Sequence, residues 1–595
     1  MHKRTFARVG PRRAKVLFYA LLLVGSYLCW RLFDVQVIKG PVYAKEALDQ
    51  RSDTVEVYAR RGSILDRDGN TLVHSLPSES VYAVPHDFGD ADQTIAALSN
   101  VLGRVSPAAH SLMHDRHMQF VWIARKITHD VADKVQALNL TGVAVIEEDT
   151  GRRIDIAGQS ASTLLGFVGI DENGLSGMEY TFDDLLKGSS GRMTLEADEF
   201  GRPLPFGSTH VLKPAKPGLS LQLTIDSYLQ YTAEAALRKQ VLGYHAKNGT
   251  AIVMDPYTGE VLAMANYPHY DPNQYWKYPA DSYRNRAVSD LYEPGSTYKL
   301  VTAAAALESG RVSSTDRFNA NGPLEVGGRR IFNALDGLTP SPSGDTLETI
   351  IADSLNVGAA RVAMAIGSRP FYDMEERLGF SRRTQIGLSS ESPGMVPAPG
   401  TWSGSSLATM SFGQGVSVTP IAMARFYCAI ANGGLLVRPR IVKSILDAQG
   451  NAIYSYPEQI ERRAFSERTA QMLRGYLRAV VVHGTGNPSA KIAGYTTAGK
   501  TGTAQAVING RYDGYIASFI GMIPYEHPRY VIFVKVEQPQ DAIYGSVVAA
   551  PAFDAIAKAA MLRSGVLPAV TPPPLSSPAP ARKRLVRLGA AAKPL

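Results

Sequence analysis

Four residues, Ser296-Thr297-Tyr298-Lys299, have the types and the spacing of a serine nucleophile that carries its own base. On a helix, residues three apart lie on one face with Cβ atoms roughly 5–6 Å apart, so a lysine amine can reach the serine hydroxyl. A lysine removed from water has a lowered pKa and can take the serine proton, whereas a solvent-exposed lysine cannot do so at neutral pH. The motif predicts acyl transfer through serine, although Ser-x-x-Lys alone also occurs on solvated helix faces.

The flanking residues predict that Ser296 lies at the N-terminus of a helix. Pro294-Gly295 forms a turn, the alanine-rich run that follows is a strong helix former, and Gly310 is a suitable stop. Backbone N–H groups at a helix N-terminus favour developing negative charge. This position therefore suits a nucleophile whose reaction passes through an oxyanion.

Two further motifs follow in the chain, Ser354-Leu355-Asn356 and Lys500-Thr501-Gly502-Thr503. Taken singly, the first could be a helix cap and the second a turn. The joint order Ser-x-x-Lys, Ser-x-Asn, Lys-Thr-Gly is the active-serine set of penicillin-recognising enzymes. The three motifs together predict one catalytic site.

With these motifs the chain resembles the class B penicillin-binding proteins, which are monofunctional peptidoglycan transpeptidases. The resemblance extends over nearly the whole chain, and within the family it favours the cell-division type over the elongation type. A bifunctional class A protein would need a glycosyltransferase domain first, and the sequence shows no such acidic signature. The segments that are similar to family motifs are Arg61-Gly62-Ser-Ile-Leu-Asp66-Arg67-Asp-Gly69 and Gly177-Met-Glu179 in the pedestal, with Ser411-Phe-Gly-Gln-Gly415 and Val482-His-Gly-Thr-Gly486 later.

The resemblance implies a role for each catalytic residue. Ser296 attacks the penultimate D-Ala carbonyl of a stem peptide, and Lys299 is the base for this acylation. Ser354 passes a proton to the leaving amine, and Asn356 holds Lys299 and the substrate amide. Lys500 adds positive field to the site.

The resemblance also implies how the substrate is held. The hydroxyls of Thr501 and Thr503, on either side of Gly502, bind the terminal carboxylate of the donor. Backbone N–H groups of Ser296 and Thr503 form the oxyanion hole. No metal or organic cofactor is expected. Leu355 departs from the family pattern, because relatives often have a polar residue there.

The implied partners are peptidoglycan stem peptides, beta-lactams, a SEDS-family glycosyltransferase of the FtsW type and other division proteins in the membrane. The acceptor is expected to be an amine on a neighbouring stem peptide, the meso-diaminopimelate side chain. Two other functions remain open from the residues: a hydrolase, either a β-lactamase or a D,D-carboxypeptidase, and a non-enzymatic penicillin sensor or scaffold. The pedestal motifs suggest an ion pair between Arg61 and Glu179.

The expected fold is α+β, with five segments along the chain. Alternating apolar runs, an amphipathic helix over 227–241, a hairpin around Asp255–Gly259 and late strands predict a sheet with helices packed on it. The resemblance adds an elongated mixed pedestal and an antiparallel transpeptidase sheet. The expected segments are a cytoplasmic tail (1–15), a transmembrane anchor (16–33), a pedestal (34–217), a transpeptidase domain (218–565) and a disordered Pro/Ala/basic tail (566–595).

The N-terminus predicts the compartment. Residues 16–30 carry no charge, and a helix over 16–33 would span roughly 27 Å, close to the hydrocarbon thickness of a bilayer. Six basic residues precede it, which places the N-terminus in the cytoplasm and the rest outside. The bulky residues after the apolar run lack the pattern of a signal-peptide cleavage site. We therefore expect a single-pass inner-membrane protein with a periplasmic catalytic domain.

Charge and metal-binding residues exclude other functions. The net charge is +8, but the two basic tails carry more positive charge than that, so the body between them is slightly acidic. Such a body does not suit nucleic acid. Cys29 and Cys428 lie in apolar stretches and are expected to be small buried residues. Three histidines with helical spacing are interpreted as a polar surface rather than a metal site: His110, His114 and His117.

Overall fold

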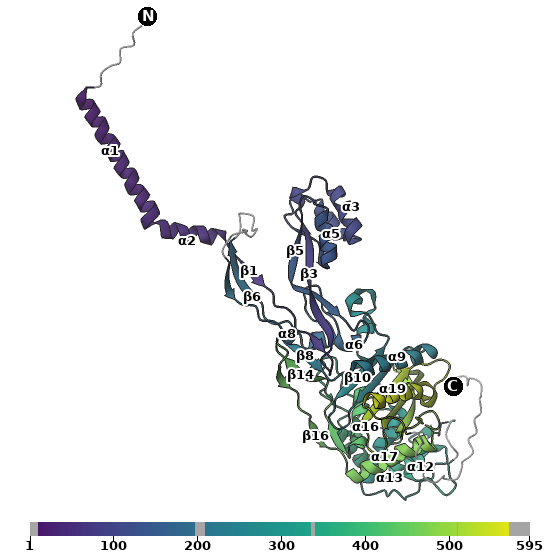
Figure 1. The fold of residues 1–595 in the computed structure, drawn as a ribbon. Helices are drawn as coiled ribbons and strands as arrows, with labels where there is room; N and C mark the ends of the chain where they lie inside the picture. The colour runs from purple at the N-terminus through teal and green to yellow at the C-terminus, as the bar shows by residue number, and fades with distance from the viewer. Residues whose placement is uncertain (1–9, 197–208, 335–339, 509, 570–595) are drawn as a thin grey trace. The chain divides into compact units, whose positions relative to one another are not determined.

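The computed structural model (Figure 1) describes residues 10–196, 209–334, 340–508 and 510–569. By its internal contacts the chain divides into two compact units. The first comprises Met1–Ala59 and Ser189–Lys216, and the second comprises Arg60–Gly188 and Pro217–Leu595. The α+β class expected from the sequence is confirmed.

The first unit contains the one described helix that is long and apolar enough to cross a membrane. Helix α1 (Pro11–Phe33) continues through a π-helical turn (Asp34–Ile38), and α2 (Gly40–Arg51) follows. No residue of α1 is buried by protein, so the expectation of a buried Cys29 is wrong, whereas Cys428 is buried. A three-stranded antiparallel sheet completes this unit, in the order β1 (Ser52–Val57), β6 (Gly191–Glu196), β7 (Thr209–Lys213).

The second unit is built on a five-stranded sheet in the order β10-β9-β19-β18-β17, in which every neighbouring pair is antiparallel. Strand β17 is an edge strand. The hairpin predicted around Asp255–Gly259 joins β9 to β10. The bounds of the five strands are β9 (Asn248–Met254), β10 (Val261–Tyr267), β17 (Ala498–Ile508), β18 (Arg511–Ile523) and β19 (Tyr530–Glu537).

Helices cover both faces of this sheet. On one face α9 (Ser227–Gly243) and α19 (Ala550–Arg563) pack together, and their apolar residues form one core with the strands. On the other face α16 (Pro420–Ala431) contacts three strands, and α11 (Lys299–Glu308) belongs to the larger core there. The other helices of the unit after α9 are α10 (Arg286–Ser289), α12 (Leu347–Ala352), α13 (Asn356–Ile366), α14 (Ser368–Leu378), α15 (Ser406–Met410), α17 (Glu467–Val482) and α18 (Gly545–Val548).

A second sheet combines strands from both sides of the boundary expected at residue 217. Its order is β15-β14-β8-β2-β3-β4, with β5 also paired to β3. Strand β2 is parallel to β8, so the segment after Arg61 is hydrogen-bonded to the start of the expected transpeptidase domain. The bounds are β2 (Ile64–Leu65), β3 (Thr71–Ala83), β4 (Val121–Ile127), β5 (Val143–Asp155), β8 (Ser220–Leu223), β14 (Val442–Leu446) and β15 (Ala452–Ser455).

Three helices pack against one end of the strands β3, β4 and β5 and share a small apolar core with them. They are α3 (Ala91–Leu102), α4 (Pro107–Met113) and α5 (His129–Ala137). Because α4 ends at Met113, His117 lies outside the helix and the helical spacing of the three histidines is not formed.

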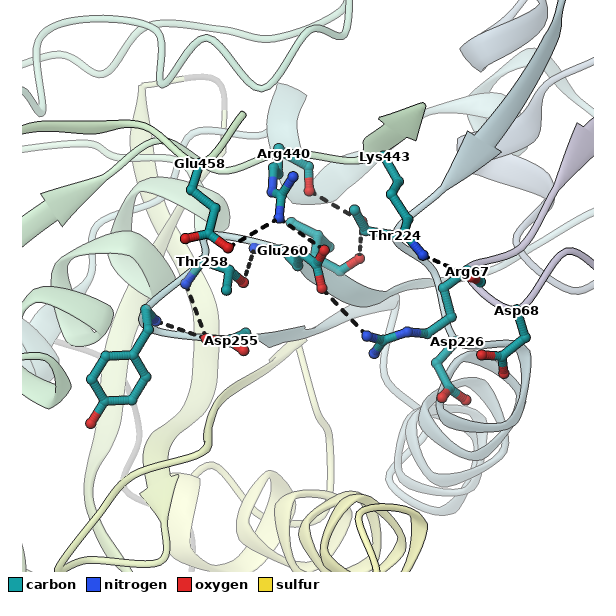
Figure 2. Close-up of polar contacts among 12 residues, drawn as sticks. Arg67, Asp68, Thr224, Asp226, Asp255, Thr258, Glu260, Arg440, Lys443 and Glu458 are labelled. Atoms are coloured by element: carbon teal, nitrogen blue, oxygen red, sulfur yellow. Dashed lines mark hydrogen bonds and ion pairs between the residues drawn. The ribbon is translucent and has the colours of Figure 1, made fainter. Parts of the chain in front are cut away.

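Ion pairs connect the segment 61–69 to the hairpin between β9 and β10. Glu260, just after the turn between β9 and β10, lies between two arginines, as Figure 2 shows: Arg440 at 2.9 Å and Arg67 at 3.4 Å. Lys443 donates to the backbone carbonyl of Arg67 over 3.3 Å. The sheet pairing and these contacts make the segment 61–69 part of the structure that supports the five-stranded sheet.

Candidate active site

Ser296 lies in a single 3₁₀ turn, Gly295–Tyr298, which leads directly into α11. The sequence predicted an α-helix from this point, and the difference is the tighter first turn. Gly295 has φ +55°, and a Cβ there would lie 2.9 Å from the Cβ of Ala504 on β17. Its N–H donates to the carbonyl of Gly413 over 3.1 Å. Glycine at 295 therefore lets the turn that carries Ser296, the predicted nucleophile, approach both β17 and the 411–415 loop.

Lys299 is fully buried and its amine points to two serines. Nζ lies 3.1 Å from Ser296 Oγ and donates to the backbone carbonyl of Ser354 over 2.6 Å. It also lies 3.2 Å from Ser354 Oγ. Ser296 and Lys299 lie close together, as predicted. Ser354, in the second motif, also holds the Lys299 amine through hydrogen bonds.

Ser354 occupies the short connection between α12 and α13 with φ +59°, a conformation that residues other than glycine rarely adopt. Its hydroxyl accepts a hydrogen bond from Lys500 Nζ over 3.0 Å, in addition to the contact with Lys299. One serine oxygen therefore bridges the two lysines. Strained backbone of this kind is frequent at functional sites.

The other two residues of the second motif face different surroundings. Leu355 is fully buried in the main core, so an apolar side chain suits this position and its departure from the family pattern has a packing reason. Asn356 begins α13, and its side-chain amide donates to the carbonyl of Phe332 over 3.0 Å. Asn356 also lines the catalytic cavity described below.

The third motif lies on the edge strand β17. Lys500 is fully buried, and the hydroxyl of Thr501 is 2.8 Å from that of Thr485. A Cβ at Gly502 would come within 2.3 Å of the Ser518 hydroxyl, so only glycine fits there. The hydroxyl of Thr503 accepts from the N–H of Gly545 over 3.4 Å.

These motifs meet in one cavity of about 240 Å³. Residues from all three predicted motifs line it: Ser296, Ser354, Asn356, Thr501 and Thr503. Other lining residues had no role assigned from the sequence, and they include Phe412, Gln414, Thr485, Tyr515, Ile543 and Tyr544. Phe412, Gln414 and Thr485 belong to the segments 411–415 and 482–486 that resemble family motifs. Tyr515, Ile543 and Tyr544 come from stretches that carried no sequence signal.

The carboxylate of Glu293 links two segments next to this site through hydrogen bonds. Glu293, three residues before the nucleophile, accepts a hydrogen bond from the N–H of Gly415 over 2.8 Å. The hydroxyl of Tyr512 on β18 lies 3.4 Å from the same carboxylate. Burial raises the pKa of Glu293 above its ordinary value, and these hydrogen bonds partly oppose the shift.

None of the predicted pedestal residues lines the cavity, and Arg61 and Glu179 form buried contacts of their own. Arg61 makes the expected ion pair with Glu179 at 2.7 Å and a second with Asp183 at 2.7 Å. Glu179 is also paired with Arg153 at 2.7 Å. A Cβ on Gly62 would be 2.0 Å from the carbonyl of Leu219, which explains the glycine.

Asp66 organises the turn that follows Gly62. Its carboxylate accepts hydrogen bonds from the backbone N–H of Asn70 over 2.8 Å and from the hydroxyl of Ser227 over 2.6 Å. Partial burial opposes ionisation of Asp66, but these bonds outweigh it and lower its pKa. The pedestal motif is therefore a supporting structure in this chain.

Two protein-family models match the chain. Residues 249–558 match the penicillin binding protein transpeptidase domain, and residues 56–223 match the penicillin-binding protein dimerisation domain. Among curated relatives, stage V sporulation protein D of Bacillus subtilis is 34% identical over 569 residues, covering 93% of this chain and 86% of that protein. Peptidoglycan D,D-transpeptidase FtsI of Escherichia coli K12 is 33% identical over 554 residues, covering 91% and 90%.

Solved structures agree with the family models. Penicillin binding protein 3 of Mycobacterium tuberculosis, in its apo form, superimposes with a TM-score of 0.66 at 30% identity, covering 88% of this chain and 100% of that one. A peptidoglycan synthetase from Bifidobacterium adolescentis gives a TM-score of 0.68 at 27% identity, covering 88% and 98%.

Proposed function

The chain belongs to the class B penicillin-binding proteins, and from this premise we propose that it is a peptidoglycan D,D-transpeptidase that acts through an acyl-enzyme on Ser296. The observation that supports the proposal most strongly is a series of side-chain hydrogen bonds beside one cavity, which links Ser296, Lys299, Ser354 and Lys500. Relatives named as D,D-transpeptidases extend over most of the chain and support the same reaction.

Acylation follows from the contacts of Lys299. Its neutral amine takes the proton of Ser296 Oγ across 3.1 Å as that oxygen bonds to the penultimate D-Ala carbonyl carbon. Full burial and a second lysine on the same Ser354 hydroxyl both favour the neutral form of one amine. The proton passes through Ser354 to the leaving nitrogen, the peptide bond breaks and terminal D-Ala departs.

Binding groups surround the reacting carbonyl. The N–H groups of Ser296 and Thr503 donate to the oxyanion, and losing one such donor costs roughly 100- to 1000-fold in related catalysis. The hydroxyls of Thr501 and Thr503 bind the donor's terminal carboxylate in the positive field of Lys500. The free edge of β17 offers backbone groups to an extended stem peptide.

In the second half-reaction an acceptor amine attacks the ester, and Ser296 leaves with a proton returned through Lys299. The amine of a meso-diaminopimelate side chain is the proposed acceptor. The site needs no cofactor in this scheme, and beta-lactams would acylate the same serine. If water attacked instead, the protein would be a carboxypeptidase or β-lactamase.

We assign the protein to septal synthesis in the inner membrane. Helix α1 is the single-pass anchor, with the basic residues 3–15 in the cytoplasm and the catalytic unit in the periplasm. The proposed domains are a pedestal over 34–217 and a transpeptidase domain over 218–565. A SEDS-family glycosyltransferase of the FtsW type and other division proteins are the proposed membrane partners.

The test is incubation of the full-length protein with labelled donor stem peptide and an acceptor amine. We expect cross-linked dimer and released D-Ala, and neither from S296A. Cleaved donor without dimer would identify a hydrolase. Normal cross-linking and growth of cells with S296A as the only copy would support a scaffold. A fluorescent fusion along the side wall rather than at midcell would contradict the septal assignment.

A further inference from the structure

Tyr298 lies between Ser296 and Lys299 in the catalytic turn and makes a buried hydrogen bond to another helix. Its hydroxyl donates to Oε1 of Glu375 on α14 over 2.7 Å. Both side chains are fully buried, and α14 packs against α11. No residue of α14 lines the catalytic cavity. The bond therefore ties the turn that carries the nucleophile and its base to an element outside the site.

The carboxyl of Glu375 is poorly solvated. Within the described ranges its second oxygen, Oε2, has no hydrogen-bond partner. Burial raises the pKa of Glu375 to about 8; the bond from Tyr298 opposes this shift, and Glu376 adds to it. Burial therefore favours the uncharged form of Glu375 at neutral pH.

The surroundings give an ionised Glu375 little compensation. Phe371, Met374 and Leu378 of its own helix are core residues, and the Phe380 ring lies 5.4 Å from that of Tyr298. Of the ionisable groups on the packed elements, Lys299 is bonded to Ser296 and Ser354, and Glu308 to Ser466 and Thr469. The others are Arg361 on α13, whose Nε is buried without a partner among the described residues, and five residues of α14: Tyr372, Glu376, Arg377, and Arg369 and Asp373, which pair with each other.

We propose that Glu375 is a positioning residue for acyl transfer, which holds the Ser296–Lys299 turn through the Tyr298 hydroxyl only while its carboxyl is uncharged. This inference rests on the function proposed above for Ser296. Nothing in the three sequence motifs indicates it, because Glu375 is far from them in the chain.

The physical basis is the cost of creating a charge in this core. An ionised Glu375 would have one hydrogen-bond donor, Tyr298, and no ion-pair partner in the described part of the chain, so α14 and the turn must separate to admit water. Lys299 follows Tyr298 directly, and any shift of the turn moves its amine relative to Ser296 Oγ. A displacement of about 1 Å at a reacting group can cost roughly 100-fold in rate.

The experiment measures the rate constant for acylation of full-length protein by a fluorescent penicillin between pH 6 and pH 10. In E375Q the amide oxygen still accepts from Tyr298, but no charge can form. We expect the E375Q and wild-type rate constants to be similar at pH 6–7. At pH 9 the E375Q rate constant should exceed the wild-type one about tenfold, since a group with a pKa of about 8 is then mostly ionised. Taking this ratio at each pH removes any pH dependence that both proteins share.

Two other variants separate positioning from general stability. Burial also raises the pKa of Asp155, at the end of β5, to about 8. D155N therefore removes a carboxyl that titrates in the same pH range as Glu375 but lies far in sequence from the Gly295–Tyr298 turn. Its acylation profile should superimpose on the wild-type profile. Y298F removes the hydrogen bond from residue 298 to Glu375 and should slow acylation at every pH.

Three outcomes would overturn the inference: superimposable E375Q and wild-type profiles, the same alkaline gain in D155N, or an unaffected Y298F. Failure of the wild type to acylate at any pH would instead refute the proposed function of Ser296. The two failures are therefore distinguishable.

Discussion

At the scale of single residues, the candidate site converges on the hydroxyl of Ser354. This oxygen contacts the amines of both Lys299 and Lys500, and the backbone carbonyl of the same residue receives Lys299 as well. A side chain in a left-handed backbone conformation is held there by its surroundings, so its oxygen has little freedom to move.

We predict that S354A lowers the acylation rate constant roughly 100-fold or more, because a positioned proton-transfer group is worth about 10²–10⁴ in rate. The melting temperature should change little, since the carbonyl that holds Lys299 is retained. S343A, an exposed serine whose hydroxyl contacts Ser341, is the control and should acylate normally. A wild-type rate in S354A would remove Ser354 from the proton path.

A second residue-scale prediction concerns stability in acid. Burial opposes ionisation of Glu537, but fully buried Lys535 beside it outweighs burial and lowers its pKa to about 2. The stabilising effect is therefore present above the ordinary pKa of 4.5 and is lost as pH falls toward 2. In E537Q the free energy of unfolding should drop by on the order of 3 kcal/mol at pH 7, and less as pH falls below 4.5.

Urea unfolding from pH 7 to pH 3 tests this prediction for Glu537. E325Q, which removes a carboxylate whose side chain is 75% exposed, should give a small difference that does not depend on pH in this way. A constant difference for E537Q across the range would show that its ion pair with Lys535 does not shift the titration.

The residue types and spacings of the catalytic motifs could be predicted, because the chemistry requires them. In the structure the side chains of Ser296, Lys299, Ser354 and Lys500 do lie together. The hydroxyl bridge through Ser354 could not be predicted, since it depends on a left-handed residue with no glycine to signal it. Leu355 was ambiguous in sequence, because only the fold shows that its side chain points into the core.

At the scale of elements, the catalytic turn, the 411–415 loop and β17 are held at close backbone approach. Gly413 has φ +78°, and a Cβ there would lie 2.4 Å from the carbonyl oxygen of Gly295. The loop is therefore fitted directly against the turn that bears the nucleophile, and an added methyl group must displace one of them.

We predict that G413A loses more stability than positive φ alone explains and also slows acylation. The matched control is G387A, because Gly387 has φ +88° but open space around its Cβ position. G387A should lose about 1–2 kcal/mol of unfolding free energy, the usual cost of a left-handed alanine, and acylate normally. Equal losses in the two variants, with normal acylation in both, would show that the loop and turn can separate freely.

Most elements with strong periodicity were predictable, including the helix after Asp226 and the hairpin around Asp255–Gly259. The sheet order was not, because β9 pairs with β19 from almost three hundred residues later. The start of β18 at Arg511 was not predictable either, because the first residues of this strand are exposed and carry no apolar pattern.

At the scale of the whole molecule, all catalytic and cavity-lining residues belong to one of the two compact units. The long apolar helix belongs to the other, formed by Met1–Ala59 and Ser189–Lys216. The reaction site therefore draws no residue from the unit that carries the candidate anchor.

We predict that a chain lacking residues 1–33 stays soluble after ultracentrifugation and still binds fluorescent penicillin at a rate within a few-fold of the full-length protein. The full-length chain should sediment with membranes. A truncated chain that still sediments with membranes would point to a second membrane contact. Loss of penicillin binding would show that the first unit supports the site.

The motifs of the two family domains could be recognised along the chain, because they are local in sequence. The sheet that contains β2, β8 and β14 could not be predicted, since it joins segments on both sides of residue 217. Composition changes along a sequence mark segments, but they carry no information on which strands exchange hydrogen bonds.

The edge position of β17 has a consequence for colloidal behaviour. An open strand edge is a template for another chain, and soluble proteins usually blunt such edges with charge, proline or a covering element. If β17 must accept a stem peptide, it cannot be blunted in those ways beside Lys500-Thr501-Gly502. Protection against aggregation and admission of substrate would then depend on the same strand edge.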